Sequence, residues 1–171
     1  EQRFAALEGG AAAICTSSGQ AASFYAIANV AEAGDNILIS DKLYGGSVTL
    51  LTYTMKRFGI TAKVFKSDDA SDLESLIDDK TKAIYFESLS NPQIAIPDVE
   101  KVVEIAKKHG VLTICDNTVA SAALFNPIKW GVDVVVHSTS KYTNGQGTAI
   151  GGIIVERDGL AEFFKANSKR Y

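Results

Sequence analysis

Short runs of β-branched and aromatic residues alternate along this chain with longer amphipathic stretches. The runs are apolar at consecutive positions, which is typical of strands that are buried on both faces. Such strands, separated by helices, predict an α/β domain with a mostly parallel sheet and helices on both of its faces. The predicted strands are 36–40, 62–65, 82–88, 111–116, 133–138 and 150–156.

The stretches between these strands carry helical patterns. The pattern from 96 to 110 is the best marked, because Pro97 stands at its start and Gly110 follows its basic last turn. No internal repeat, low-complexity segment or linker interrupts the alternation, so residues 1–171 are predicted to form one domain. The predicted helices begin at Gly19, Tyr44, Ser71 and Ile96.

The composition narrows the class of protein. Hydrophobic residues make up 46% and charged residues 22%, as in an ordinary globular domain. The net charge of −3 argues against nucleic acid or an anionic membrane surface as partner, since both need clustered positive charge. No apolar run approaches the roughly 20 residues that a transmembrane helix needs. Cys15 and Cys115 each lie in an apolar segment, which predicts two reduced core cysteines and suits a cytoplasmic protein.

The sequence at each end of the chain has a helical pattern or lies just beyond one. It begins with "EQRFAALEGG", which lacks an initiator methionine, and it ends with "FFKANSKRY". We therefore expect a piece of a longer protein.

Several catalytic and binding motifs are absent. No Gly-Lys pair is present for a P-loop, and "GQGTAIGG" leads into a strand, unlike a dinucleotide-binding G-x-G-x-x-G, which opens a helix. Ser138 and Lys141 match the S-x-x-K pattern of penicillin-interactive serine enzymes, but the S-D-N and K-T-G elements do not follow. His109 reads as a helix-end cation and His137 as a strand-end residue, and neither is spaced as a metal ligand with a cysteine. We predict no metal site.

Polar residues follow several predicted strands, at the edge of the sheet where ligands bind in such folds. The Ser-Ser-Gly at 17–19 stands at a helix N-terminus, where free N–H groups favour an anion such as phosphate, although the same residues also suit an ordinary N-cap. Ser138, Ser140 and Lys141 follow a run of valines, and Asp116 ends another strand. An anion site, a lysine and an acid are thus expected at one edge.

These groups meet the requirements of pyridoxal 5′-phosphate. The cofactor needs an anchor for its phosphate, a lysine for its aldehyde and an acid beside its ring nitrogen. A lysine near neutral pH is nucleophilic only where desolvation or a nearby cation destabilises its ammonium form. Taken alone, Asp116 is more typical of a helix or turn cap, and it is the combination that favours the cofactor.

The run "CDNTVASAALFNPIKWGVDVVVHSTSKYTNGQGTAIGG" resembles the Cys/Met-metabolism family of fold-type I pyridoxal-phosphate enzymes. The segments "TSSGQAA", "DKLYGGS" and "FESLSNPQIAIPD" fit the same family, in the same order and at suitable spacing. The resemblance covers essentially the whole chain. It implies the large cofactor-binding domain of an aspartate-aminotransferase-like enzyme.

The resemblance implies catalytic and ring-binding roles for four residues. Lys141 would form the Schiff base with the cofactor, and Asp116 would pair with its pyridinium nitrogen. Tyr44 of "LYGG" would stack on the ring and act in acid–base steps. Asn91 of "SNP" would lie near the ring hydroxyl.

For the phosphate, the resemblance implies backbone N–H groups from Gly19 and Gln20 and the hydroxyls of Ser138 and Ser140. Gln20 departs from the methionine that is common in the family, and a backbone contact tolerates that change. The family also builds each site from two chains, because an N-terminal arm supplies a Tyr and an Arg to the phosphate of the neighbouring chain. A C-terminal domain supplies an arginine that binds the substrate carboxylate. A homodimer or homotetramer is therefore implied, and these 171 residues alone are expected to be a poor enzyme.

The loop after the lysine bears on the reaction. "GQGTAIGG" is similar to the G-x-G-T-x-I-G-G form of O-acetylhomoserine sulfhydrylases, whereas lyases and cystathionine synthases often read "GHGD". The implied reaction is γ-replacement of acetate by sulfide or a thiol, giving homocysteine or methionine in methionine biosynthesis. Alternatives are a methionine or cystathionine γ-lyase, a cystathionine γ-synthase, or a non-catalytic scaffold paralogue that binds the cofactor.

Overall fold

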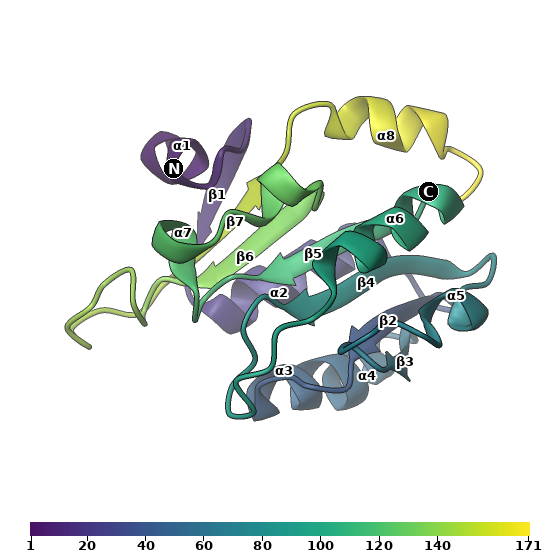
Figure 1. Cartoon of the computed structure of the whole chain (residues 1–171), viewed down its shortest axis with the longest axis horizontal. Coiled ribbons are helices and arrows are strands. Elements are labelled where there is room, and N and C mark those ends of the chain that lie inside the picture. Colours follow the sequence, from purple (N-terminus) through teal and green to yellow (C-terminus); the bar gives the residue numbers. More distant parts are fainter.

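A seven-stranded sheet in the order β1-β7-β6-β5-β4-β2-β3 forms the centre of the structure (Figure 1). A computed structural model describes residues 1–171. Strands β2 to β6 run parallel, and β7 is antiparallel to both of its neighbours, β6 and β1. The prediction of a mostly parallel α/β sheet is therefore confirmed. The strands are β1 (Ala12–Thr16), β2 (Asn36–Ser40), β3 (Thr61–Phe65), β4 (Thr81–Glu87), β5 (Leu112–Asp116), β6 (Val134–Ser138) and β7 (Gly152–Glu156).

Helices cover both faces of this sheet. In Figure 1, α6 lies in front of the sheet and α2 behind it. No helix is both long enough and apolar enough to cross a membrane. The helices are α1 (Gln2–Glu8), α2 (Gly19–Ala28), α3 (Gly45–Thr49), the π-helical turn η1 (Leu50–Thr54), α4 (Met55–Arg57), α5 (Leu73–Leu76), α6 (Val99–His109), α7 (Ser121–Leu124), the 3₁₀ turn η2 (Pro127–Trp130) and α8 (Leu160–Ala166).

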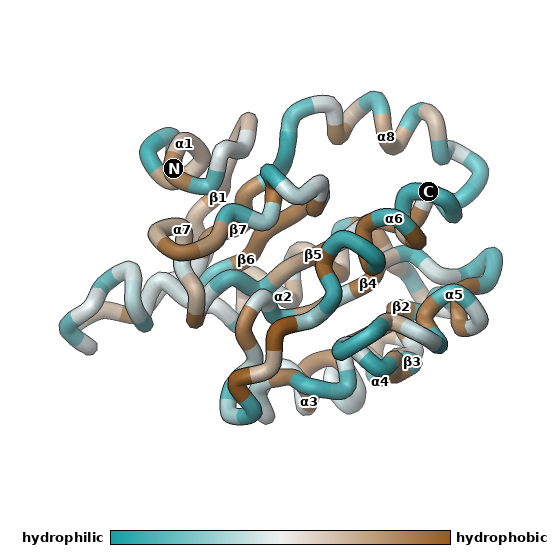
Figure 2. Tube along the Cα trace, viewed as in Figure 1, coloured by the Kyte–Doolittle hydropathy of each residue, from teal (hydrophilic) through white to brown (hydrophobic).

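Alternate side chains of each strand enter two separate apolar cores. On β2, Leu38 faces the core beneath α1, α5 and α6, whereas Ile37 and Ile39 face the core beneath α2, α4 and α8. Burial on both faces explains why the strands read as continuous apolar runs rather than as alternating ones. Helix α6 is banded brown and teal in Figure 2, as expected of a helix with one face on the sheet and the other in solvent.

Helix α6 begins two residues later than its proline suggests. The Asp98 side chain is the N-cap and accepts a hydrogen bond from the Lys101 N–H (3.1 Å), so the helix starts at Val99 and Pro97 precedes the cap. Its end is where the sequence predicts, at Gly110 with φ 61°.

Strand β1 is the one strand that the sequence pattern does not predict. It lies at the edge of the sheet, and its residues alternate irregularly between exposed and half-buried. Cys15 lies on this strand and is exposed, whereas Cys115 is buried and the two are not bonded. The prediction of two core cysteines was therefore wrong for Cys15, because an edge strand leaves its side chain uncovered.

Candidate functional site

Polar side chains end three adjacent parallel strands on the face covered by α2. Glu87 ends β4, Asp116 ends β5 and Ser138 ends β6. Each stands two positions after a residue of the core beneath α2, and alternate residues of a strand share a face. Glu87 and Asp116 are also direct partners in the register of β4 and β5. Two carboxyl groups and a hydroxyl thus gather at the carboxyl edge of the sheet.

The Asp116 carboxylate is half-buried and accepts hydrogen bonds from neutral donors. Its Oδ1 accepts from the N–H (2.9 Å) and the hydroxyl (2.5 Å) of Thr118, and its Oδ2 accepts from the Tyr85 hydroxyl (3.3 Å). Burial raises the pKa of Asp116, and the hydrogen bonds from Thr118 oppose that rise without cancelling it. The nearby His137 lowers this pKa as well, and no lysine or arginine forms an ion pair with Asp116.

Glu87 is a second acid beside Asp116, and its side chain ties two loops together. Its residue is 5% exposed; Oε1 accepts from the Tyr44 N–H (2.7 Å) and Oε2 from the Asn91 N–H (3.1 Å). Burial raises its pKa to about 7, and the nearby charge of Asp116 adds to the rise. The strand-end rule that selects Asp116 would have found Glu87 too, had the predicted strand ended at 87 rather than 88.

The first turn of α2 is seated directly on the end of β6. Ser18 caps the helix, since its hydroxyl accepts from the Ala21 N–H (3.1 Å), whereas the N–H groups of Gly19 and Gln20 have no acceptor in the chain. A Cβ at Gly19 would lie 2.5 Å from the Cβ and 2.8 Å from the Cα of Ser138. Only glycine allows so close an approach, which brings two free donors to the Ser138 hydroxyl.

Tyr44 lies on the same side of the sheet, at the N-cap of α3. Its residue is 49% exposed. A Cβ built on Gly46 would lie 2.5 Å from the Tyr44 ring and 3.4 Å from Gln20 Nε2. The Tyr44 ring and the Gln20 amide therefore border one spot beside the start of α2.

The remaining predicted site residues lie in loops at this edge. Lys141 is exposed in the turn after β6, where its N–H donates to the Ser138 carbonyl (3.2 Å). The Ser140 hydroxyl accepts from the Gly151 N–H (3.0 Å) and contacts the Gly151 carbonyl (3.3 Å), so its proton is already engaged. The Asn91 side chain is exposed, and only its backbone is held in place, by a carboxylate on β4.

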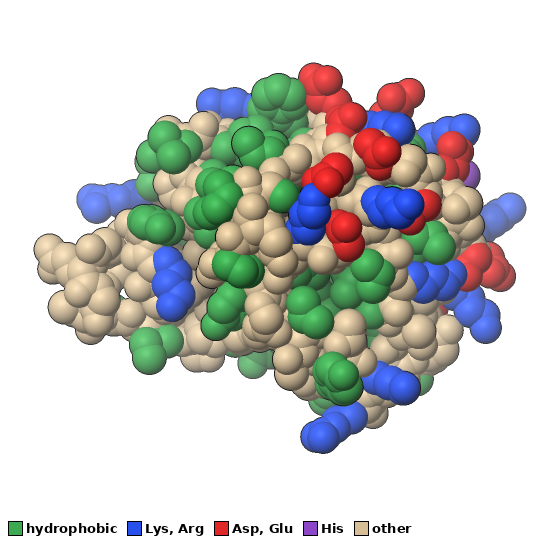
Figure 3. Space-filling model, turned by 60° about the horizontal axis from the view of Figure 1, so that its bottom comes forward, with side chains coloured by type: hydrophobic (Ala, Val, Ile, Leu, Met, Phe, Trp, Pro, Cys, Tyr) green, Lys and Arg blue, Asp and Glu red, His purple; other side chains and the backbone are tan.

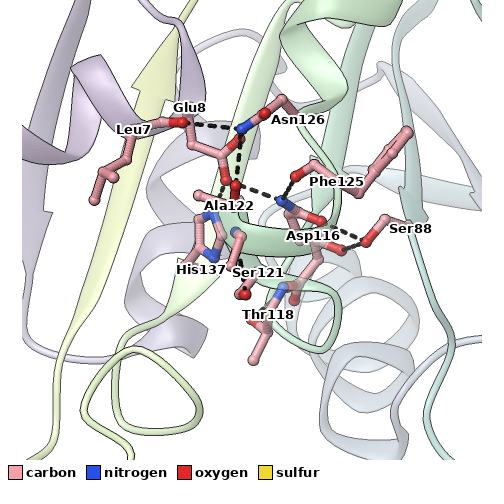
Figure 4. Close-up of polar contacts among 12 residues, drawn as sticks. Leu7, Glu8, Ser88, Asp116, Thr118, Ser121, Ala122, Phe125, Asn126 and His137 are labelled. Atoms are coloured by element: carbon pink, nitrogen blue, oxygen red, sulfur yellow. Dashed lines mark hydrogen bonds and ion pairs between the residues drawn. The ribbon is translucent and has the colours of Figure 1, made fainter.

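A buried polar network lies on the opposite face of β5 and β6 (Figure 4). Glu8 of α1 is fully buried; its Oε1 contacts His137 Nε2 (2.5 Å) and accepts from Asn117 Nδ2 (2.9 Å). Asn126 also donates to the Leu7 carbonyl (2.9 Å). The network ties α1 to the two strand ends, and His137 is a buried partner of Glu8 rather than merely a strand-end residue. No local pattern could reveal it, because Glu8 and His137 stand 129 positions apart.

One hollow of the surface lies elsewhere. It measures about 470 Å³ and is lined by residues of α6 and α7 and the loops beside them, including Ile96, Leu124 and Trp130. These elements belong to the face opposite α2. Its lining is mainly hydrophobic, whereas two carboxyl groups and a hydroxyl gather at the ends of β4, β5 and β6, so we place the functional site at those strand ends.

Residues 1–169 match the model of a family described as Cys/Met metabolism PLP-dependent enzyme. The chain belongs to this family. The predicted family is thereby confirmed, and with it a fold built around pyridoxal 5′-phosphate (PLP).

Three relatives in this PLP-dependent family differ in their sequence identity to this chain. The chain is 48% identical over 157 residues to a homocysteine/cysteine synthase of Saccharomyces cerevisiae, covering 91% of this chain and 35% of that protein. A crystal structure of a Campylobacter jejuni protein assigned as an O-acetylhomoserine (thiol)-lyase, which contains a pyridoxyl-lysine group, is 56% identical with a TM-score of 0.96, covering 98% of this chain and 41% of the other. Cystathionine γ-lyase of Lactobacillus plantarum is 36% identical with a TM-score of 0.87, covering 96% and 43%. The chain thus spans less than half the length of each of these proteins.

The strand-end groups fit the cofactor of this family. A phosphate group needs several hydrogen-bond donors, and α2 offers free N–H groups where a Cβ would already be too large. A protonated ring nitrogen needs a carboxylate, and Asp116 offers one at the end of β5 that is not paired to a lysine or arginine. Both requirements are met on one face of the sheet.

Proposed function

We propose that the full-length protein is an O-acetylhomoserine sulfhydrylase. In this γ-replacement the Cγ–O bond of O-acetylhomoserine breaks, acetate leaves with the electron pair, and a Cγ–S bond forms to sulfide or a thiol. The products are homocysteine or methionine, with acetate. The proposal is supported by the identity of 48–56% to a homocysteine/cysteine synthase and a protein assigned as an O-acetylhomoserine (thiol)-lyase, against 36% to a cystathionine γ-lyase.

The groups of α2, β5 and β6 would bind and orient the cofactor. When bound, PLP supplies an aldehyde that bonds to amines and a ring that withdraws electrons from the substrate. The N–H groups of Gly19 and Gln20, with the hydroxyl of Ser138, would hold the phosphate. Asp116 would hold a proton on the ring nitrogen, because the ion pair relieves the cost of its own buried charge.

Lys141 and Tyr44 would carry the proton transfers. The Lys141 amine stands on an exposed turn, where it would remove the proton from the substrate Cα, help to remove one from Cβ and later return both. Tyr44, beside the start of α2, would assist the departure of acetate. Both groups are accessible to a substrate that arrives from solvent.

Two further residues would complete the cofactor contacts. Asn91 would lie at the ring hydroxyl, at a position fixed through its backbone N–H. Ser140 would bind phosphate only after its hydroxyl proton turns away from the Gly151 carbonyl. We therefore expect Ser140→Ala to weaken cofactor binding less than Ser138→Ala does.

An assay of substrate choice tests the reaction. The full-length protein should form homocysteine from O-acetylhomoserine and sulfide, and should release little ammonia from cysteine, cystathionine or methionine. Failure to use sulfide, with efficient γ-elimination instead, would assign the protein to the lyases. A protein that binds PLP but turns over none of these substrates would be a non-catalytic paralogue.

A second experiment tests the site. The full-length protein should be yellow, and reduction with borohydride followed by peptide mapping should locate the cofactor on Lys141. A reduced adduct that persists unchanged in Lys141→Ala would show that another lysine holds it.

We also propose that the protein is cytoplasmic and self-associates as a homodimer or homotetramer. Large apolar side chains stand exposed, among them Leu124 and Ile150, each 82% exposed. One part of the face in Figure 3 carries mainly hydrophobic side chains, and another carries acidic and basic ones together. Sedimentation of the full-length protein should give the mass of two or four chains, and cell fractionation should find it in the cytosol.

A further inference from the structure

One carboxylate connects the sheet to two loops of the candidate site. The two oxygens of Glu87 accept separately, one from the Tyr44 N–H (2.7 Å) and the other from the Asn91 N–H (3.1 Å). These loops are distant in sequence, and Glu87 itself is anchored in β4. The position of each loop at this point is therefore set by the same rigid strand end.

Both loops carry residues that the proposed function places at the cofactor ring. The bonds from Glu87 reach the backbone of Tyr44 and Asn91, not their side chains. The carboxylate consequently fixes where each side chain starts, while the phenol and the amide remain free to contact a ligand. This is how a residue acts through others without touching the reacting atoms.

The surroundings of Glu87 are unfavourable for a charged residue that serves only to stabilise the fold. It is buried at the end of β4 directly opposite Asp116, another acid, with no lysine or arginine paired to it. Burying a charge beside a like charge costs free energy, which two hydrogen bonds only partly offset. A neutral glutamine of the same shape would avoid that cost, but it has one acceptor oxygen where Glu87 uses two.

We propose that Glu87 is a positioning residue, whose two carboxylate oxygens together hold Tyr44 and Asn91 in the geometry that the reaction needs. The proposal rests on the proposed function, because it gives these two residues their roles. It goes further by naming a group that touches neither cofactor nor substrate.

The first test compares Glu87→Gln with Asp133→Asn in the full-length holoenzyme. Asp133 is an equally buried carboxylate at the amino end of β6, where it accepts from the Thr113 N–H (2.8 Å) and hydroxyl (2.7 Å). Glu87→Gln should lower kcat by about 10- to 100-fold, the scale of a misplacement near 1 Å, with KM and PLP affinity within about threefold. Asp133→Asn should leave kcat within about twofold once folding is verified.

A double-mutant cycle separates positioning from a general loss of structure. If Glu87 acts by placing Tyr44, the loss of kcat caused by Tyr44→Phe should shrink markedly in the Glu87→Gln background. Two independent effects would instead multiply. In the Asp133→Asn background the effect of Tyr44→Phe should be unchanged.

Amide hydrogen exchange gives a readout that does not depend on turnover. In Glu87→Gln the single acceptor oxygen can serve only one loop, so the amide of Tyr44 or of Asn91 should exchange faster, by about tenfold, while the Ala21 amide that Ser18 caps stays unchanged. The circular dichroism of the bound cofactor should also change, because the ring's neighbours move.

These outcomes separate the two proposals. A wild-type protein without sulfhydrylase activity would defeat the proposed reaction, while the exchange data would still show whether Glu87 holds the two loops. If the wild type is active, any of three results would overturn the positioning role. These are an unchanged kcat in Glu87→Gln, an equal loss of kcat in Asp133→Asn, or effects of Glu87→Gln and Tyr44→Phe on kcat that simply multiply.

Discussion

Replacing Gly19 by alanine should raise the Kd of PLP, because the added methyl group would overlap with Ser138. The new Cβ would lie 2.5 Å from the Ser138 Cβ and 2.8 Å from its Cα, whereas non-bonded carbons prefer about 3.5–4.0 Å. Because one of the opposing atoms is backbone, helix α2 has to move by roughly 1 Å. Overpacking of this kind costs about 1–3 kcal/mol, which corresponds to a rise of roughly 5- to 150-fold in the Kd of PLP.

The measurement is an equilibrium titration of the full-length apoprotein with PLP, followed by absorbance. Gly45→Ala is the matched control, because Gly45 also opens a helix, α3, and a Cβ there would meet nothing within 4 Å. Alanine favours a helix over glycine by about 1 kcal/mol, so helix propensity alone would make Gly19→Ala harmless. Equal PLP affinities for the two variants would refute the argument that the start of α2 on β6 forms the phosphate site.

Three further predictions concern the stability of the fold and the loop that carries Tyr44. Burial raises the pKa of Glu87 from 4.5 to about 7, so the folded state keeps a proton that the unfolded state has lost. The free energy of unfolding should therefore fall as the pH rises from about 4.5 to 7, and urea titrations should find this fall smaller by about 3 kcal/mol in Glu87→Gln. Gly46→Ala should push the Tyr44 ring aside and lower kcat with little change in PLP affinity, as steady-state kinetics and PLP titration would show. Glu8→Ala should cost about 3–5 kcal/mol in urea denaturation, because it leaves His137 buried without its partner, and a loss under 1 kcal/mol would contradict that account.

Most of the strands were predictable because each one has a local sequence signal. Strands such as 36–40 are buried on both faces, and their unbroken apolar runs carry that information within five residues. Strand β1 escaped the prediction for the opposite reason. As an edge strand it has exposed and half-buried positions, and what makes it a strand is its pairing with β7, some 140 residues later.

The candidate site was predictable only as far as the ends of strands reveal it. Asp116, Ser138 and the start of α2 follow from the rule that ligands bind at the carboxyl edge of a parallel sheet. Glu87 did not, because its function depends on which loops fold over it. The Glu8–His137 pair could not be predicted from local sequence, because its two residues lie on different elements and meet only when the sheet is complete.

The antiparallel pairing of β1 with β7 constrains the order in which the molecule can assemble during synthesis. Strands β2 to β5 find their neighbours within a continuous stretch of chain, whereas β1 has no partner until β7 has left the ribosome. Contacts between such distant segments form slowly, because a long loop has to be closed first. Strand β7, which joins β1 to β6, therefore enters the sheet in the last stage of folding, and a nascent chain halted before residue 152 would carry Asp116 and Glu87 without the strand that completes their sheet.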